Sequence, residues 1–236
     1  MFIVKLFRLF LFKVSGLAMH IERKLPVPTV TLAGDRAIEN SWVAAHMPPG
    51  PGKALDFGTG NSHLWLSAAM SGYEISGIDL RTPKWFYKHS NIEFVQGDIL
   101  DHNIPPDNFD LIINCSSIEH VGLVGRYGVN TSNEEGDFQV MKLLLKLIKP
   151  TGKMILTIPI GQDSVFPPLH RVYGRDRLPL LLSGWETLKE EYWNKDDHNL
   201  WGKVDKETAL SRKPVRDLYG IGCFVLQTSQ NPSQEL

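Results

Sequence analysis

Residues 54–62 read ALDFGTGNS, an apolar segment that carries one acidic residue and leads to a glycine-rich turn. The pattern predicts a short buried strand around Asp56, a tight turn through Gly58 and Gly60, and a helix after the turn. Glycine adopts positive φ at little steric cost and lets the backbone approach a ligand closely. Because glycine is common in every kind of tight turn, the segment alone is also compatible with a plain strand-to-helix connection.

On both sides of this segment, apolar strands alternate with segments of helical spacing. We expect strands at 53–57, 73–78, 92–96, 109–115 and 153–159, and helices at 35–47, 62–71, 134–148 and 174–183. Such alternation is typical of a parallel sheet with helices on both faces. Two late strands, at 185–192 and 220–228, lack room for full crossover helices and predict an antiparallel addition. The predicted fold is α/β: a Rossmann-like, doubly wound, mostly parallel seven-stranded sheet with an antiparallel edge strand.

Charge and cysteine content narrow the function classes. The chain of 236 residues has a formal net charge of -1, so it lacks the overall basic field of many nucleic-acid-binding proteins. We therefore expect no nucleic-acid partner. Cys115 and Cys223 both lie in apolar runs, which predicts buried, unbridged thiols and a cytoplasmic location.

The first 19 residues, MFIVKLFRLFLFKVSGLAM, form a separate feature. Lys5, Arg8 and Lys13 interrupt the apolar run, which argues against a signal peptide or a membrane-spanning helix. At helical spacing these cations share one side and the apolar residues share the other. We expect an amphipathic helix and connector over 1–34. The helix suits a peripheral position on a membrane surface, a protein partner, or packing on the protein's own core.

Acidic residues also follow the second and third predicted strands. Asp79 stands 19 residues after Gly60, and Asp98 lies in the sequence GDIL at 97–100. In open α/β sheets ligands bind at the carboxyl ends of the strands, and an acid in the position of Asp79 hydrogen-bonds ribose hydroxyls. The pattern therefore predicts a nucleotide-containing cofactor. His63 stands where a nicotinamide-binding turn needs its third small residue, which argues against NAD.

The order of these motifs resembles the class I S-adenosylmethionine (SAM) dependent methyltransferases. The resemblance covers roughly residues 50–160 and extends loosely to the last strand; it rests on LDFGTG, GIDL, VQGDIL, FDLIINCSSIEHV and LIKPTGKMILTIP. The segments at 116–128 and 170–186 are similar to a branch associated with bacterial surface-polysaccharide and glycan clusters. The resemblance implies a class I methyltransferase domain over 35–236.

The resemblance also implies a cofactor site for SAM, with S-adenosylhomocysteine as the product. The implied cofactor residues are Asp56, Gly58 and Gly60 around the methionine part, Asp79 at the ribose, Asp98 and Ile99 at the adenine, and Asn114 and Ser116 at the methionine end. Ser62 departs from the pattern, because many members of the superfamily have a third glycine at this position.

Residues on the later loops are candidates for chemistry and for the acceptor. His120 and His170 are candidate general bases, because imidazole titrates near neutral pH. Arg126, Tyr127 and Arg171 are candidates for substrate binding, since a guanidinium suits a carboxylate or phosphate. Each could equally shape a loop or pack in it. The histidines and cysteines show no spacing typical of metal ligands.

The expected function is that of a SAM-dependent methyltransferase (EC 2.1.1.-), most simply an O-methyltransferase of a small molecule or glycan in glycan biosynthesis. Two alternatives remain: N- or C-methylation of a small metabolite, and a non-catalytic scaffold of the same fold anchored by its N-terminal helix.

Overall fold

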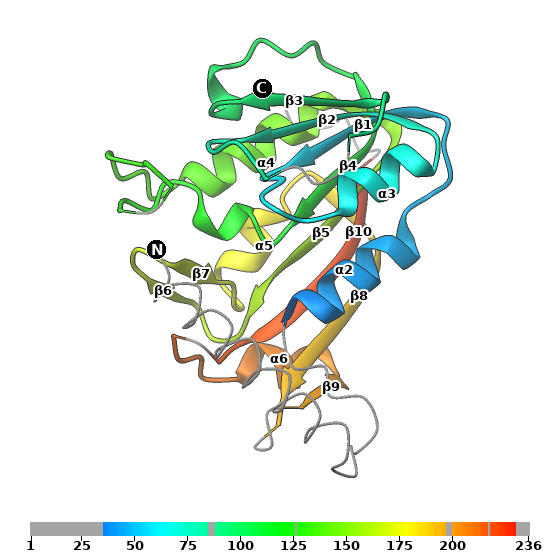
Figure 1. The fold of residues 1–236 in the computed structure, drawn as a ribbon. Coiled ribbons are helices and arrows are strands. Elements are labelled where there is room, and N and C mark those ends of the chain that lie inside the picture. The colour runs from blue at the N-terminus through cyan, green and yellow to red at the C-terminus, as the bar shows by residue number, and fades with distance from the viewer. Residues whose placement is uncertain (1–34, 85–87, 126, 197–199, 217, 230–236) are drawn as a thin grey trace, which may run out of the picture.

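Eight strands form one sheet in the order β3-β2-β1-β4-β5-β10-β8-β9 (Figure 1). The computed structural model describes residues 35–84, 88–125, 127–196, 200–216 and 218–229. The strands of the sheet are β1 (Gly52–Phe57), β2 (Tyr73–Asp79), β3 (Ile92–Gln96), β4 (Phe109–Cys115), β5 (Ile148–Ile160), β8 (Trp185–Lys195), β9 (Trp201–Val204) and β10 (Gly220–Thr228).

The sheet has a parallel part and an antiparallel part. Strand β1 pairs in parallel with β2 and β4, and the parallel ladder continues to β3 on one side and β5 on the other. Strand β10 is antiparallel to both β5 and β8, and β9 is antiparallel to β8. Strand β4 lies inside the sheet between β1 and β5, and its almost continuous burial fits its apolar sequence. The predicted α/β class and the mostly parallel sheet are confirmed.

The predicted strand count of seven was wrong. Strand β8 extends past Tyr192 to Lys195, and this extension pairs with β9. The four residues of β9 are too few to show an alternating pattern, so periodicity did not reveal them. The antiparallel strand β10 also lies inside the sheet, between β5 and β8, rather than at its edge.

Helices cover both faces of the sheet (Figure 1). On one face, α2 (Asp35–His46) and α3 (Leu64–Met70) bury an apolar cluster that includes Trp42, Trp65 and Ile113. On the other face, α4 (Gly136–Leu147), α5 (Arg177–Leu181) and α6 (Lys206–Ser211) pack against residues such as Ile112 and Leu156. Burial of these two clusters removes apolar surface from water, which is the main stabilising term of the fold.

Three smaller elements shape the loops at the carboxyl ends of the strands. They are two 3-10 turns, η1 (Ile99–Asp101) and η2 (Ile118–His120), and a two-stranded sheet of β6 (Ser164–Phe166) and β7 (His170–Val172). Within the described ranges, no helix is long and apolar enough to cross a membrane. The expected amphipathic helix over 1–34 lies outside the described residues.

Candidate functional site

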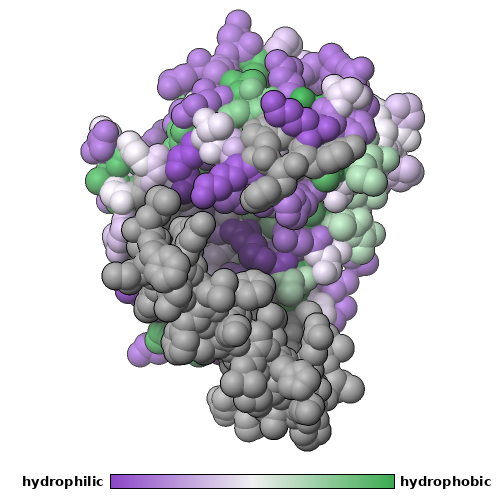
Figure 2. All heavy atoms as spheres, in the orientation of Figure 1, coloured by the Kyte–Doolittle hydropathy of each residue, from purple (hydrophilic) through white to green (hydrophobic). Residues whose placement is uncertain are grey.

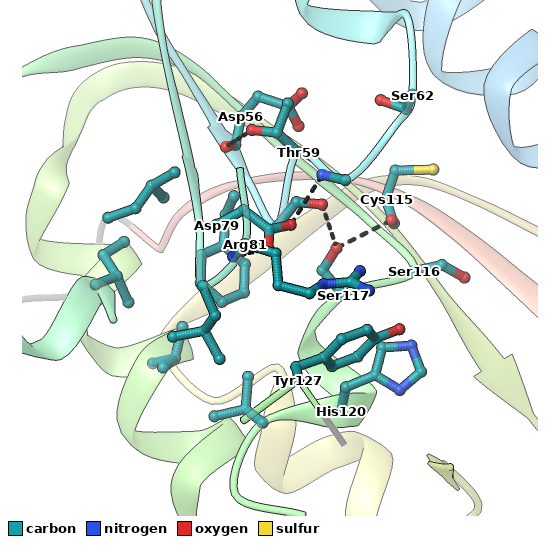
Figure 3. Close-up of a pocket in the computed structure, with 18 of the residues that line it drawn as sticks. Asp56, Thr59, Ser62, Asp79, Arg81, Cys115, Ser116, Ser117, His120 and Tyr127 are labelled. Atoms are coloured by element: carbon teal, nitrogen blue, oxygen red, sulfur yellow. Dashed lines mark hydrogen bonds between the residues drawn. The ribbon is translucent and has the colours of Figure 1, made fainter. Parts of the chain in front are cut away.

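A cavity of about 410 Å³ opens at the carboxyl ends of the parallel strands (Figure 3). Figure 2 shows a hollow in the middle of this face, with hydrophilic side chains around it. Among the predicted site residues, those that line the cavity are Asp56, Gly58, Gly60, Asp79, Asp98, Ile99, Ser116, His120 and Tyr127. The location agrees with the rule that open α/β sheets bind ligands outside the carboxyl ends of their strands.

Asp79 joins the end of β2 to the glycine turn that follows β1. Its Oδ2 accepts a hydrogen bond from the Gly60 N–H at 2.9 Å, and its Oδ1 accepts one from the Arg81 N–H at 2.8 Å. A carboxylate oxygen can accept two hydrogen bonds. Each oxygen of Asp79 therefore retains a lone pair toward the cavity for a pair of hydroxyl groups.

Asp56 is a buried acid with an unsatisfied oxygen. The residue is 2% exposed, and its Oδ2 has no hydrogen-bond partner among the described residues. Burial, and to a smaller extent the charge of Asp79, raises the pKa of Asp56 to about 7. A buried polar atom without a partner is costly, so a ligand with a positively charged or hydrogen-donating group would be favoured here.

The glycine turn lies against the end of β4. Gly58 and Gly60 adopt φ of +70° and +54°, in the left-handed region that favours glycine. A Cβ atom on Gly58 would lie 2.3 Å from the Ser117 Oγ, whereas a Cβ atom on Gly60 would meet nothing closer than 3.7 Å. Ser117 Oγ donates to the Gly58 carbonyl at 3.1 Å, which fixes the turn to the loop after β4. Only glycine fits at position 58 without moving this loop.

The third acid lies after β3. Asp98 Oδ1 accepts the Leu100 N–H at 3.0 Å and caps η1, and the buried Ile99 presents an apolar surface to the cavity beside it. An acid next to an apolar side chain suits a planar ring that carries an amino group.

Asn114 does not line the cavity, contrary to the prediction. Successive side chains of a strand point to opposite faces of the sheet. The adjacent Cys115 lines the cavity, so Asn114 points to the face covered by α4, where it is fully buried. The next residue, Ser116, turns back toward α2 with φ of +50° and donates a hydrogen bond to Glu39.

Of the two predicted bases, His120 lies on the cavity wall and His170 does not. His120 Nδ1 is hydrogen-bonded to the Leu169 carbonyl, and the His120 ring meets Tyr127 edge-on at 5.4 Å. His170 is buried on β7 with its ring against Phe166 and Tyr219. The short β6–β7 hairpin turns His170 away from the cavity, so its assignment as a base is corrected to a packing role.

The three substrate-binding predictions have different outcomes. Tyr127 lines the cavity, and the Arg81 guanidinium lies 4.2 Å from its ring centroid (Figure 3). Arg126 lies outside the described residues. Arg171 is 2% exposed and donates to the carbonyls of Val121 and Asn133. Arg171 therefore holds the loop between η2 and α4 in place and does not reach the cavity.

Helix α2 supplies wall residues that the sequence prediction missed. Arg36 and Asn40 line the cavity, one helical turn apart. Between them Glu39 is buried and accepts hydrogen bonds from Ser116 Oγ and, at 3.0 Å, from Thr157 Oγ1. The sequence contains one signal for Glu39: it is an acid on the buried side of an amphipathic helix. Carboxylates are rarely buried without a partner, so such a residue indicates a buried polar contact. In the described ranges, no cluster of three or more His, Cys, Asp or Glu side chains could hold a metal ion.

The buried acids predict an unusual pH dependence of stability. Burial raises the pKa of Asp56, Glu39 and Glu119 to about 7, so the folded state holds protons that the unfolded chain releases near pH 4. We expect the free energy of unfolding to fall as the pH rises from about 5 to about 7, and to level off above about 8. Each group contributes a slope of at most about 1.4 kcal/mol per pH unit. Urea denaturation across this range measures the slope.

Two variants test the origin of this slope. Glu119→Gln removes one of the three groups and should make the slope shallower. Glu93→Gln, an exposed glutamate of β3, is the matched control and should leave it unchanged. A wild-type stability that is flat or rises between about pH 5 and about pH 7 would contradict the expectation.

The architecture matches the fold of solved SAM-dependent methyltransferases. The chain is similar to the 1,6-didemethyltoxoflavin-N1-methyltransferase of Burkholderia thailandensis, solved with 1,6-didemethyltoxoflavin and S-adenosylhomocysteine, with a TM-score of 0.57, 15% identity, and coverage of 94% of this chain and 89% of that one. It is also similar to phosphoethanolamine N-methyltransferase 2 of Haemonchus contortus, solved with phosphomonomethylethanolamine and S-adenosylhomocysteine, with a TM-score of 0.56, 14% identity, and coverage of 84% and 53%.

A third similar structure has a different activity. The cyclase SpnF matches with a TM-score of 0.56, 14% identity and coverage of 81% of both chains. Likeness at this level of identity shows the fold and leaves the reaction open. In sequence, the family described as Caenorhabditis protein of unknown function, DUF268, matches residues 85–212, more than half of the chain, and the chain belongs to this family. No curated protein matches the sequence.

Proposed function

We propose that the chain is a SAM-dependent methyltransferase that methylates an oxygen atom of a small molecule or glycan. The observation that carries the proposal is the convergence of Asp56, Asp79 and Asp98, from the ends of three adjacent parallel strands, on one cavity beside the glycine turn. The unsatisfied Asp56 Oδ2 and the free lone pairs of Asp79 fit a ligand with a cationic part and a ribose.

Each part of the cavity suits one part of the cofactor. Asp79 would hold the ribose hydroxyls, Asp98 and Ile99 the adenine, and Asp56 with the glycine turn the methionine part. When bound, SAM supplies a methyl group activated by the sulfonium. The acceptor would then lie beside Arg36 and His120, which also line the cavity.

A hydroxyl acceptor fits this wall because a basic group is present. A hydroxyl must lose a proton when it is methylated, and His120 is the cavity residue best suited to take it at neutral pH. N-methylation is the second candidate, since two of the similar structures bear the names of N-methyltransferases. The transferred methyl group, labelled with ¹³C, reports the acceptor atom through its chemical shift.

Calorimetric binding of S-adenosylhomocysteine and SAM tests the proposed activity. We expect micromolar binding by the wild type and at least about tenfold weaker binding by Asp79→Ala, equivalent to about 1.4 kcal/mol. Asp101→Ala, an exposed acid of η1 outside the cavity, is the matched control and should bind as the wild type does. Thermal melts check that each variant is folded.

The opposite result has a clear meaning. If the folded wild-type protein binds neither SAM nor S-adenosylhomocysteine, the methyltransferase function is excluded and the non-catalytic scaffold is favoured. The proposal also includes a cytoplasmic location and peripheral attachment of the protein to a membrane surface through residues 1–19. Both rest on the sequence pattern alone.

A further inference from the structure

Glu119, on η2, is a buried carboxylate that is only partly satisfied: backbone and Ser116 hydrogen bonds stabilise its charge, but one oxygen is left without a partner among the described residues. It is 2% exposed, and its Oε2 has no hydrogen-bond partner among the described residues. Its Oε1 lies 3.6 Å from His120 Nε2, the basic nitrogen of the neighbouring residue on the cavity wall. Buried polar atoms are nearly always paired, so an unpaired carboxylate oxygen next to a residue of the cavity wall points to a role in the chemistry of that residue.

The second buried acid of this region, Glu39, differs from Glu119 in its partners. Glu39 Oε2 lies 3.3 Å from the Arg36 guanidinium, and its Oε1 accepts from Ser116 and Thr157. Glu119 is influenced by the charge of Arg36, by a hydrogen bond from Ser116 and by the charge of Asp35, and it acts in turn on Tyr173 and Tyr219. Arg36 pairs directly with Glu39 and acts on Glu119 at longer range, whereas the ion-pair partner of Glu119 within the described residues is His120.

The orientation of His120 places its basic nitrogen beside Glu119. A backbone carbonyl only accepts hydrogen bonds, so His120 Nδ1, which contacts the Leu169 carbonyl, carries the ring proton. In the neutral ring the lone pair is then on Nε2, on the side of Glu119. The separation of 3.6 Å is longer than a direct hydrogen bond, so Glu119 acts on the His120 ring through its charge, while His120 faces the cavity.

We propose that His120 and Glu119 form a proton-accepting pair, and that the substrate is an acceptor whose nucleophilic atom carries a proton, a hydroxyl or an N–H group. The inference rests on the methyltransferase function proposed above. His120 is the catalytic residue and Glu119 its positioning residue.

The step is balanced in atoms and electrons. His120 Nε2 takes the proton of the acceptor while the acceptor lone pair forms the bond to the methyl carbon. The electron pair of the broken C–S bond stays on sulfur, which becomes a neutral thioether. The resulting imidazolium is stabilised by the Glu119 carboxylate at close range, in surroundings that exclude water.

An NMR titration of the histidines tests the pair without a substrate. The full chain, labelled with ¹⁵N in histidine and saturated with S-adenosylhomocysteine, gives the tautomer and the pKa of each ring, and His120→Gln assigns the signals. We expect a neutral His120 with its proton on Nδ1. We expect Glu119→Gln to lower the pKa of His120 by about one unit or more, a tenfold loss of proton affinity.

Controls separate a specific pair from a structural effect. Glu134→Gln removes the same charge from an exposed position of the following loop and should leave His120 unchanged. Glu119→Asp keeps the charge and should retain most of the wild-type value. The variants should bind S-adenosylhomocysteine as the wild type does, because Glu119 does not line the cavity.

The outcomes distinguish the two proposals. An unchanged His120 titration in folded Glu119→Gln overturns the pair even if S-adenosylhomocysteine binds. Loss of that binding in the wild type overturns the methyltransferase function, which the calorimetry reports separately. If Glu119→Gln does not fold, the wild-type curve decides, because two coupled groups titrate in two steps and a single-step curve overturns the pair.

Discussion

Asp137→Ala is expected to lower the free energy of unfolding by about 3–5 kcal/mol, because it leaves buried cations without their counter-charge. Asp137, at the start of α4, is fully buried. Its Oδ1 pairs with Arg177 Nη2 at 2.6 Å, and its Oδ2 accepts from Tyr173 at 3.0 Å and lies 3.8 Å from Arg171 Nε. Urea denaturation followed by circular dichroism measures the loss.

The same substitution should disturb the cavity at a distance. Arg171 also donates to the carbonyls of Val121 and Asn133, which lie on the loop that carries Tyr127. With Asp137 absent, Arg171 and Arg177 lose the anion that orients them, and this loop loses its anchor. Weaker binding of S-adenosylhomocysteine should therefore accompany the loss of stability.

A surface ion pair of equal length is the control. Arg175 Nη2 and Glu207 Oε2 are also 2.6 Å apart, but both side chains are mostly exposed to solvent. Glu207→Ala should change the stability little, because exposed ion pairs are screened by water and salt. Equal effects of the two substitutions would show that burial is not what makes the Asp137 network important.

Gly58→Ala is expected to cost about 2–4 kcal/mol of stability, the sum of left-handed backbone strain and overpacking. The φ of Gly58 is +70°, and the new Cβ would lie 2.3 Å from Ser117 Oγ. The loop after β4 must move to admit the methyl group, so binding of S-adenosylhomocysteine should weaken as well. Chemical denaturation and calorimetry measure the two effects.

Gly60→Ala separates strain from collision. Gly60 has a similar φ of +54°, but a Cβ atom there would have ordinary distances to its neighbours. Gly60→Ala should therefore lower the free energy of unfolding only by the strain of the left-handed backbone, about 1–2 kcal/mol. The double variant Gly58→Ala/Ser117→Gly should recover part of the loss of Gly58→Ala. If Gly58→Ala and Gly60→Ala lower the stability equally, and the double variant recovers nothing, then Ser117 does not confine the turn.

The features of this structure that were predicted correctly are those that a short stretch of sequence indicates by itself. The parallel strands β1 to β5 appear as apolar segments, and the acids Asp56, Asp79 and Asp98 stand at or just after strand ends, where ligand-binding residues of such sheets are expected. Their common cavity follows from parallel strands alone. Seven of the eight cofactor residues that the resemblance to class I methyltransferases implied line this cavity.

The errors concern side chains whose positions depend on distant parts of the chain. The assignment of Asn114 required knowing which face of β4 the cavity lies on. His170 and Arg171 depend on the β6–β7 hairpin, whose three-residue strands have no clear pattern. The contact of Glu39 with Ser116 spans 77 residues, and its contact with Thr157 spans 118. Local periodicity carries no information about such pairings.

The residues that line the cavity come from different parts of the chain. The three acids and the glycine turn lie between residues 56 and 98, whereas Arg36 and Asn40 come from α2, and His120 and Tyr127 from the segment after β4. Under the proposed function, substitutions in α2 or in this later segment should change the preference for the acceptor and leave the three acids in place.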